Sequence, residues 1–120
     1  MSARVLLVED SPMINGALCL LLESAGFEVT LATTAAEAAA WTGAAPPDVM
    51  LLDIGLPDAD GLSVIAALEM RGMKPGATYA MTGYPDEETR RRCIAAGCDE
   101  VLLKPVPVQQ LLRIVSEAVA

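Results

Sequence analysis

The chain alternates between short β-type runs and helical patterns five times, and this alternation occupies its whole length. We expect strands at residues 5–8, 28–32, 49–52, 78–81 and 101–103. The first and third runs are apolar throughout, which is typical of strands buried on both faces. Five β/α units with short connections favour a parallel sheet with right-handed crossovers and helices on both faces. The sequence therefore predicts a single α/β domain, residues 1–120, built on a doubly wound parallel sheet.

Local signals predict where the helices begin and end. The first helix follows Asp10, Ser11 and Pro12, which offer a capping side chain and a first-turn proline, and it ends at Gly26. Its predicted core stripe consists of Ile14, Leu18, Leu21, Leu22 and Ala25. The second helix is capped by Thr33 or Thr34 and is expected to reach about Gly43, and the remaining helices cover about 62–71, 86–97 and 108–118.

The charge balance excludes several classes of function. The chain has 16 acidic and 8 basic residues and a net charge of −8, so nucleic acid and anionic membrane surfaces would repel it. Its apolar runs are too short for a signal peptide or a membrane span. We therefore expect a cytoplasmic protein that binds neither nucleic acid nor membranes.

The three cysteines do not resemble a metal site. Cys19, Cys93 and Cys98 lack zinc-ligand spacing, and the chain contains no histidine. An odd number of cysteines also fits a reducing compartment better than a disulfide framework. We interpret all three as small buried apolar residues.

Polar residues stand at the ends of four predicted strands. Glu9 and Asp10 follow the first strand, Asp53 the third, Thr82 the fourth, and Lys104 with Pro105 the fifth. Taken singly, each has an ordinary structural explanation as a cap, a turn residue or a solvated charge. Together they place three carboxylates at one edge of the sheet, where their repulsion calls for a cation. Mg²⁺ suits such oxygen ligands and also serves phosphoryl transfer to a carboxylate nucleophile.

At these residues the sequence resembles the receiver domains of two-component response regulators over essentially its whole length. The matching positions, in order, are Glu9-Asp10, Asp53, Pro57, Asp60-Gly61, Thr82-Gly83, Ala96-Gly97 and Lys104-Pro105. The resemblance implies a flavodoxin-like sheet with strand order 2-1-3-4-5. It also implies a signalling phosphoacceptor, with self-phosphorylation and autodephosphorylation as its only enzymatic activities.

The resemblance assigns a role to each site residue. Asp53 would accept a phosphoryl group from a phosphohistidine on a sensor histidine kinase or a histidine phosphotransfer protein. Glu9, Asp10, Asp53 and the Gly55 carbonyl would hold Mg²⁺ or Mn²⁺. Thr82 and Lys104 would bind phosphoryl oxygens, and the Lys104–Pro105 bond is expected to be cis.

The sequence departs from the family pattern near the switch. Many receivers carry an aromatic residue three positions before the lysine, whereas this chain has Val101. Gly83, Tyr84 and Val101 are therefore the candidate switch and tuning positions. Tyr84 either substitutes for the missing ring and shields the aspartyl phosphate beside Gly55, or is an ordinary loop residue. The domain would then signal either by a conformational switch or by passing the phosphoryl group onward in a phosphorelay with little conformational output.

Two surfaces are candidates for partner contacts. Met13 and Ile14 lie beside the acidic site, and Cys19 and Leu20 lie off the core stripe, so this helix offers an apolar face to a phosphodonor. Arg90, Arg91 and Arg92 form a basic run that ion pairs from Glu87 and Glu88, four residues earlier, largely explain. The same run is a candidate surface for an output partner or a weak homodimer.

Three other classes of protein are alternatives to a receiver domain. A haloacid-dehalogenase-type phosphatase would need an Asp two residues after the nucleophile, where this chain has Gly55. A nucleotide-binding domain would need a glycine-rich loop at residues 9–12, which is absent. An interaction module that is never phosphorylated remains an alternative. The sequence leaves open the cognate kinase, the output partner, the phosphoryl lifetime, and whether the domain stands alone or belongs to a longer protein.

Overall fold

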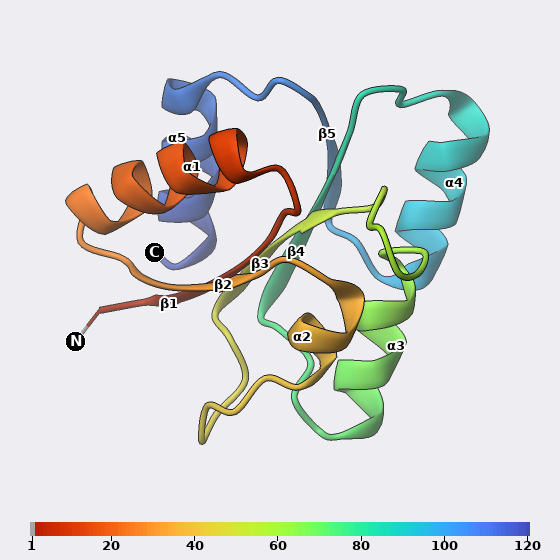
Figure 1. Ribbon diagram of the computed structural model, residues 1–120, viewed down its shortest axis with the longest axis horizontal. Coiled ribbons are helices and arrows are strands. Elements are labelled where there is room, and N and C mark those ends of the chain that lie inside the picture. The colour runs from red at the N-terminus through yellow and green to blue at the C-terminus, as the bar shows by residue number, and fades with distance from the viewer. Residues whose placement is uncertain (1) are drawn as a thin grey trace.

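Five parallel strands form a single sheet with helices on both sides in the computed structural model, which describes residues 2–120 (Figure 1). The strands are β1 (Arg4–Val8), β2 (Glu28–Ala32), β3 (Val49–Asp53), β4 (Ala77–Thr82) and β5 (Glu100–Leu103). The helices are α1 (Pro12–Ser24), α2 (Ala35–Ala39), α3 (Ser63–Met70), α4 (Glu87–Ala96) and α5 (Val108–Ala118). The strand order is β2-β1-β3-β4-β5, which confirms the predicted fold.

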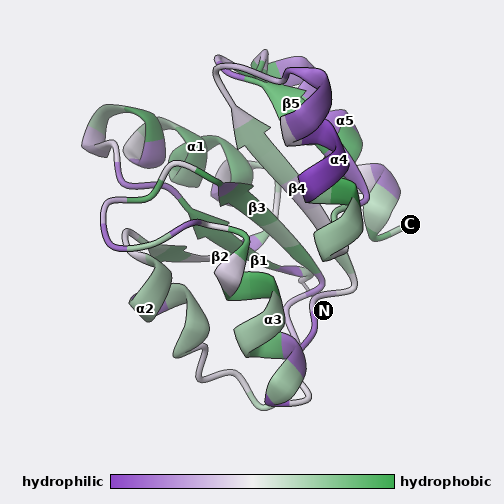
Figure 2. Cartoon of the chain, turned by 90° about the vertical axis from the view of Figure 1, so that its right-hand side faces the viewer, coloured by the Kyte–Doolittle hydropathy of each residue, from purple (hydrophilic) through white to green (hydrophobic). Residues whose placement is uncertain are grey.

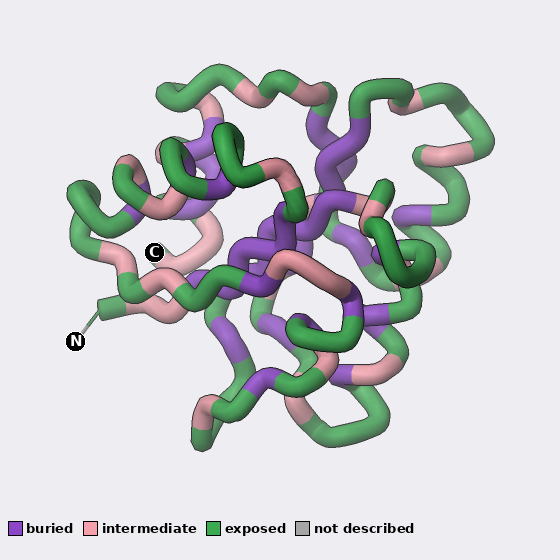
Figure 3. Tube along the Cα trace, in the orientation of Figure 1, coloured by how far each residue is buried: buried purple, intermediate pink, exposed green. Residues whose placement is uncertain are grey.

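The sheet divides the interior into two apolar cores. Side chains alternate along a strand, so neighbouring residues of β1 and β3 enter opposite cores. Leu6 and Leu52 belong to the core covered by α2, α3 and α4, whereas Leu7 and Leu51 belong to the core covered by α1 and α5. Figures 2 and 3 show that the central strands β1 and β3 are largely apolar and buried, whereas the edge strand β2 is mostly exposed.

Several predicted helix ends are confirmed. The Thr34 side chain accepts a hydrogen bond from the Glu37 N–H at 3.1 Å, and Asp86 accepts one from the Thr89 N–H at 2.8 Å. Gly97 terminates α4 with φ at +110°, the left-handed region that glycine occupies without a steric penalty.

The predicted core stripe of α1 was partly wrong. Leu18 and Leu22 are buried, but Ile14 and Ala25 are exposed and Asn15 takes a buried place. The predicted capping side chain was also wrong, because Ser11 occupies the N-cap without a side-chain hydrogen bond. The first turn therefore lies over the polar strand ends, where Asn15 finds a backbone partner, and not over apolar core.

The second helix is shorter than predicted, because α2 ends at Ala39 and not near Gly43. The Trp41 indole turns into the core, and its N–H donates to the Ala45 carbonyl at 2.8 Å. Arg71, from the end of α3, donates to the Ala39 carbonyl at 2.5 Å and the Trp41 carbonyl at 2.7 Å. These contacts from distant residues end the helix where its alanine-rich sequence alone would let it continue.

The cysteines follow the prediction with one exception. Cys93 and Cys98 are buried in the core beside α4, but Cys19 is only half-buried because it lies at the edge of the α1 packing face. Across residues 2–120, the structure contains no helix with the length and apolar character needed to cross a bilayer.

Candidate functional site

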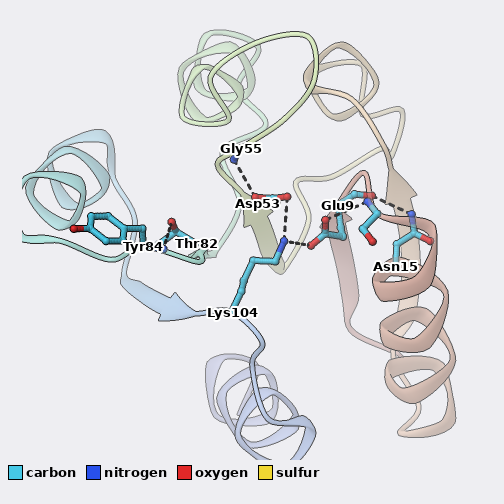
Figure 4. A network of polar contacts seen from close by, with 8 residues as sticks. Glu9, Asn15, Asp53, Gly55, Thr82, Tyr84 and Lys104 are labelled. Atoms are coloured by element: carbon cyan, nitrogen blue, oxygen red, sulfur yellow. Dashed lines mark hydrogen bonds and ion pairs between the residues drawn. The ribbon is translucent and has the colours of Figure 1, made fainter.

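The carboxyl ends of four strands bring the predicted polar residues to one edge of the sheet (Figure 4). Glu9 and Asp10 directly follow β1, Asp53 ends β3, Thr82 ends β4, and Lys104 directly follows β5. Because all the strands are parallel, their carboxyl ends share this edge.

Three carboxylates gather at the centre of this edge. One oxygen each from Glu9, Asp10 and Asp53 lie within 4.8 Å of one another. Glu9 and Asp53 are buried, and Asp10 is exposed. Burial raises the pKa of Glu9, and the lowering effects of Lys104 and of the Ser11 N–H offset this only in part.

Lys104 lies between two of these carboxylates. Its Nζ atom is 2.7 Å from Glu9 Oε1 and 3.2 Å from Asp53 Oδ2. Burial alone would lower the pKa of Lys104, but the contacts with Glu9 and Asp53 outweigh it and raise the pKa. The ammonium is therefore charged at neutral pH and neutralises only part of the negative charge around it.

The backbone after β3 orients the Asp53 carboxylate. The Gly55 N–H donates to Asp53 Oδ1 at 2.9 Å. The loop then folds back, so that the Gly61 N–H donates to the Ile54 carbonyl at 3.0 Å. A Cβ atom on Gly61 would lie 2.6 Å from both the Asp53 carbonyl oxygen and the Ile54 Cα, so only glycine permits this close approach.

The end of β4 presents a hydroxyl, from Thr82, and is followed by an uncrowded glycine, Gly83. Thr82 is buried and its Oγ1 accepts a hydrogen bond from the Tyr84 N–H at 3.1 Å. Gly83 has open space around it. The Tyr84 ring is 75% exposed and points away from Asp53, so it does not cover the carboxylate in this conformation (Figure 4). Val101 is buried in the core beside α4.

Two supporting contacts to Glu9 were not predicted from the sequence. The Asn15 amide donates to the Glu9 carbonyl at 3.1 Å, and the Ser11 N–H donates to Glu9 Oε2 at 3.3 Å. Both contacts hold the start of α1 against the residue that follows β1. The sequence did contain a signal for Asn15, because it is a polar residue three positions before Leu18 and seven before Leu22, where a core-facing helix position would normally be apolar.

The basic run of α4 pairs differently from the prediction. Arg91 forms the expected ion pair with Glu87 at 3.5 Å, but Arg92 pairs with Asp60 and not with Glu88. Asp60 lies in the loop between β3 and α3, which faces this side of α4. The predicted cis bond between Lys104 and Pro105 is confirmed.

The donor atoms fit a hard divalent cation. Three carboxylates, from Glu9, Asp10 and Asp53, share this edge, and the Lys104 ammonium contacts two of them, so the cluster keeps a net negative charge. A cluster of carboxylate oxygens with such an excess of negative charge is the ligand set that Mg²⁺ and Mn²⁺ prefer.

Comparisons with known proteins agree with this arrangement. The family model for the response regulator receiver domain matches residues 5–116. The transcriptional regulatory protein KdpE of Mycobacterium tuberculosis is 33% identical over 115 residues, which cover 96% of this chain and 50% of KdpE. PhoP of Escherichia coli is 29% identical over 109 residues, which cover 91% of this chain and 48% of PhoP. The chain thus spans about half the length of these curated relatives.

Solved structures give the same result. A CheY-like receiver domain protein from Methanospirillum hungatei has a TM-score of 0.86 and 32% identity, covering 98% of this chain and 93% of the other. Vibrio cholerae CheY4 has a TM-score of 0.89 and 28% identity, covering 98% and 99%. The receiver domain of sensor histidine kinase PA1611 from Pseudomonas aeruginosa, solved with a magnesium ion in its active site cleft, has a TM-score of 0.83 and 28% identity, covering 99% and 98%.

Proposed function

The chain belongs to the response regulator receiver domain family of two-component signalling, and we propose that residues 1–120 form one such domain with Asp53 as the phosphoacceptor. The observation that carries the proposal is the setting of Asp53. It is a buried carboxylate at the end of the central strand, with the Lys104 Nζ atom 3.2 Å from one oxygen and the Gly55 N–H 2.9 Å from the other.

The reaction is a transfer between two side chains. A carboxylate oxygen of Asp53 attacks the phosphorus of a phosphohistidine, the new O–P bond forms, and the P–N bond breaks. The imidazole nitrogen keeps the electron pair of the broken bond and takes a proton from solvent. Because little covalent chemistry is left to the protein, its contribution is to position the carboxylate and to neutralise charge.

Glu9, Asp10, Asp53 and the Gly55 carbonyl would hold a divalent cation, Mg²⁺ or Mn²⁺. When bound, the ion supplies positive charge next to the phosphoryl oxygens. The excess of three carboxylates over one ammonium supports this assignment, and so does the magnesium ion in the cleft of the receiver domain of PA1611.

Two groups would hold the phosphoryl group after transfer. Lys104 would exchange its contact with Asp53 Oδ2 for a contact with a phosphoryl oxygen, which carries more negative charge. The Thr82 hydroxyl, which now only accepts a bond from the Tyr84 N–H, still has its proton to donate. A shift of Thr82 toward the phosphoryl group would carry the Tyr84 segment with it and so signal the change.

Intact-mass measurement tests the assignment. The protein is incubated with Mg²⁺ and acetyl phosphate, or with a phosphorylated histidine kinase. We expect the wild-type chain to gain the mass of one phosphoryl group and Asp53→Asn to gain none. Asp48→Asn, which changes an exposed carboxylate at the opposite end of β3, is the matched control and should behave as wild type. No mass gain from any donor would favour an interaction module that is never phosphorylated.

We also propose that α1 receives the phosphodonor, a histidine kinase or a histidine phosphotransfer protein. Met13 is 87% exposed beside the acidic site, and Leu20 is exposed two turns further along the same helix. Met13→Asp should slow transfer from the protein donor while leaving transfer from acetyl phosphate unchanged. Equal loss with both donors would contradict docking at α1 and would point instead to damage at the site.

The lifetime of the aspartyl phosphate depends on access of water to Asp53, and autodephosphorylation would limit the signal. Tyr84 points outward, and we propose that it moves over the site once Thr82 has shifted, because its N–H is bonded to Thr82 Oγ1 (Figure 4). Tyr84→Ala should then speed loss of the phosphoryl group, as followed by mass over time. An unchanged rate would show that the ring provides no shielding.

We propose that this receiver domain acts in the cytoplasm, where kinase domains hold their phosphohistidine.

A further inference from the structure

Arg92 reaches from α4 to the loop that follows the phosphoacceptor strand. Its guanidinium pairs with Asp60 Oδ2, and both side chains are 50% exposed. We infer that Arg92 is a positioning residue for Asp53, which it influences through the loop of residues 54–61, and that the same contact couples this loop to α4. The inference rests on the proposed role of Asp53.

The backbone of Asp60 and its second carboxylate oxygen, Oδ1, are both held by hydrogen bonds within the loop. Gly55 and Asp60 form an antiparallel bridge across the loop. Next to the bridge, the Gly61 N–H donates to the Ile54 carbonyl at 3.0 Å. The other carboxylate oxygen of Asp60, Oδ1, accepts a hydrogen bond from the Leu62 N–H at 3.0 Å. Because the Asp60 side chain cannot rotate without breaking the bond to the Leu62 N–H, a displacement of Arg92 would move the backbone of the loop.

The bridge leads directly to the phosphoacceptor. Gly55, on the opposite side of the bridge from Asp60, donates its N–H to Asp53 Oδ1 at 2.9 Å. This bond fixes the plane of the Asp53 carboxylate and hence the direction of the oxygen that faces Lys104. Arg92 thus acts on Asp53 through Asp60 and Gly55, each step being a contact in the structure.

The helix at the other end of this connection has little other anchoring. All residues of α4 are described, and Cys93 is the only one that is buried. Ala96 is half-buried against the same core, residues 87–92 are all polar and form the purple part of α4 in Figure 2, and Ile94 and Ala95 are exposed. Because coupling is reciprocal, a change at Asp53 that displaces the loop would loosen α4, and a partner bound to α4 would alter the Asp53 site.

Replacing Arg92 changes Mg²⁺ affinity in opposite directions, depending on whether Arg92 positions Asp53 or acts only through its charge. Removing the positive charge of Arg92 would by itself strengthen binding of a cation to the nearby acidic site. Loss of positioning would weaken it, because Asp53 is one of the proposed ligands. We expect Arg92→Gln to weaken Mg²⁺ binding two- to fivefold, about the range of a half-exposed ion pair.

The experiment compares variants by NMR titration with MgCl₂ and by amide hydrogen exchange without metal. Arg92→Gln should weaken Mg²⁺ binding and speed exchange at Gly55 and along residues 90–97. Arg92→Lys should restore most of both. Asp60→Asn keeps the acceptor for the Leu62 N–H and should match Arg92→Gln, and the double variant should be no worse than either single variant.

Arg91→Gln is the matched control, since it removes the same charge from the same helix but breaks only the pair with Glu87. Equal behaviour of Arg92→Gln and Arg91→Gln, or additive effects in the double variant, would overturn the inference. Failure of wild-type protein to bind Mg²⁺ would instead contradict the proposed function. In that case the hydrogen-exchange rates at Gly55 and in α4 still test whether Arg92 couples the loop to α4.

Discussion

Lys104 carries a structural task in addition to its proposed contact with phosphate. Its ammonium lies 2.7 Å from Glu9 Oε1 and 3.2 Å from Asp53 Oδ2, and without it two buried carboxylates would face each other. Lys104→Met should therefore lower the free energy of unfolding in metal-free buffer by about 1–3 kcal/mol. This is below the value for a fully buried pair, because the Lys104 side chain keeps 21% of its exposure.

Urea denaturation with and without MgCl₂ measures this effect. The cation should stabilise Lys104→Met more than wild type, since it replaces the missing positive charge. Lys74→Met, at an exposed position outside the site, is the control and should leave both measurements near wild type. If Lys104→Met resembled Lys74→Met in both buffers, the ammonium would have no part in stabilising the acidic cluster.

The close packing of backbone atoms around Gly61 leads to a second prediction at the scale of single residues. A Cβ at this position would meet the Asp53 carbonyl oxygen and the Ile54 Cα at 2.6 Å, and backbone atoms cannot move aside as a flexible side chain can. Gly61→Ala should cost about 1–3 kcal/mol of stability and slow phosphorylation of Asp53. Gly83→Ala, with open space around the added methyl group, should unfold at the same urea concentration as wild type.

The meeting of Glu9, Asp53 and Lys104 at one edge of the sheet was predictable because Asp53 ends a strand and the other two residues directly follow one. Parallel strands bring their carboxyl ends together whatever the details of packing, so Glu9, Asp53 and Lys104 had to meet. The partner of Arg92 was not predictable in this way. A pair between α4 and a distant loop depends on how the helix is rotated and placed, and the local rule that favoured Glu88 contains neither quantity.

Among the elements, α2 depends on a contact from outside itself. Asp58, in the loop after β3, accepts hydrogen bonds from the Ala35 N–H at 2.8 Å and the Ala36 N–H at 3.1 Å. These bonds satisfy free amides of the first turn and lower the pKa of Asp58, with the Ala35 N–H the largest cause. The loop that carries the site thereby also holds the start of α2.

The lowered pKa gives a prediction for the pH dependence of stability. The folded protein keeps Asp58 ionised to a lower pH than the unfolded chain does. The contribution of the ionised Asp58 carboxylate to the stability of the folded protein is therefore complete at neutral pH. It is lost as the pH falls through the lowered pKa of Asp58 in the folded protein. Asp58→Ala should be less stable than wild type at pH ~7, and the difference should shrink toward pH ~3.

Urea denaturation at both pH values tests this, with circular dichroism reporting the helix content. Glu69→Ala, which removes an exposed carboxylate from α3, is the control and should show no such convergence. A stability difference between wild type and Asp58→Ala that stayed constant with pH would mean that the charge of Asp58 does not matter.

Local signals correctly predicted both ends of α4, at Asp86 and Gly97. At the end of α2 the local signal, Gly43, was misleading. Its alanines favour continuation, and only the burial of Trp41 and the two bonds from Arg71 stop the helix at Ala39. Tertiary contacts of this kind override propensity and cannot be derived from a short window of sequence.

At the scale of the whole molecule, the cysteines report on global unfolding. Cys93 and Cys98 are buried, and burial raises the pKa of Cys98 to about 12, so the folded protein offers no reactive thiolate at these positions. Iodoacetamide at neutral pH should modify half-buried Cys19 first. Cys93 and Cys98 should react only as fast as the chain unfolds, and they should react together.

Peptide mass spectrometry during a urea series measures these rates. The midpoint for Cys93 and Cys98 should coincide with the midpoint seen by circular dichroism, since both lie in a core formed by distant parts of the chain. Modification of Cys93 well below that midpoint would reveal separate opening of α4. The control is Cys19→Ser, which should remove the early reaction and leave the later one unchanged.

The division of the interior by the sheet has a consequence for how such a protein changes over generations. The face proposed to meet the donor belongs to α1, which packs with α5, whereas α4 packs on the opposite core. Substitutions that adapt one core to a new surface leave the packing of the other untouched. If α1 meets the donor as proposed, a lineage could acquire a new donor while the surface of α4 stays unchanged, and duplicated copies could diverge on one side at a time.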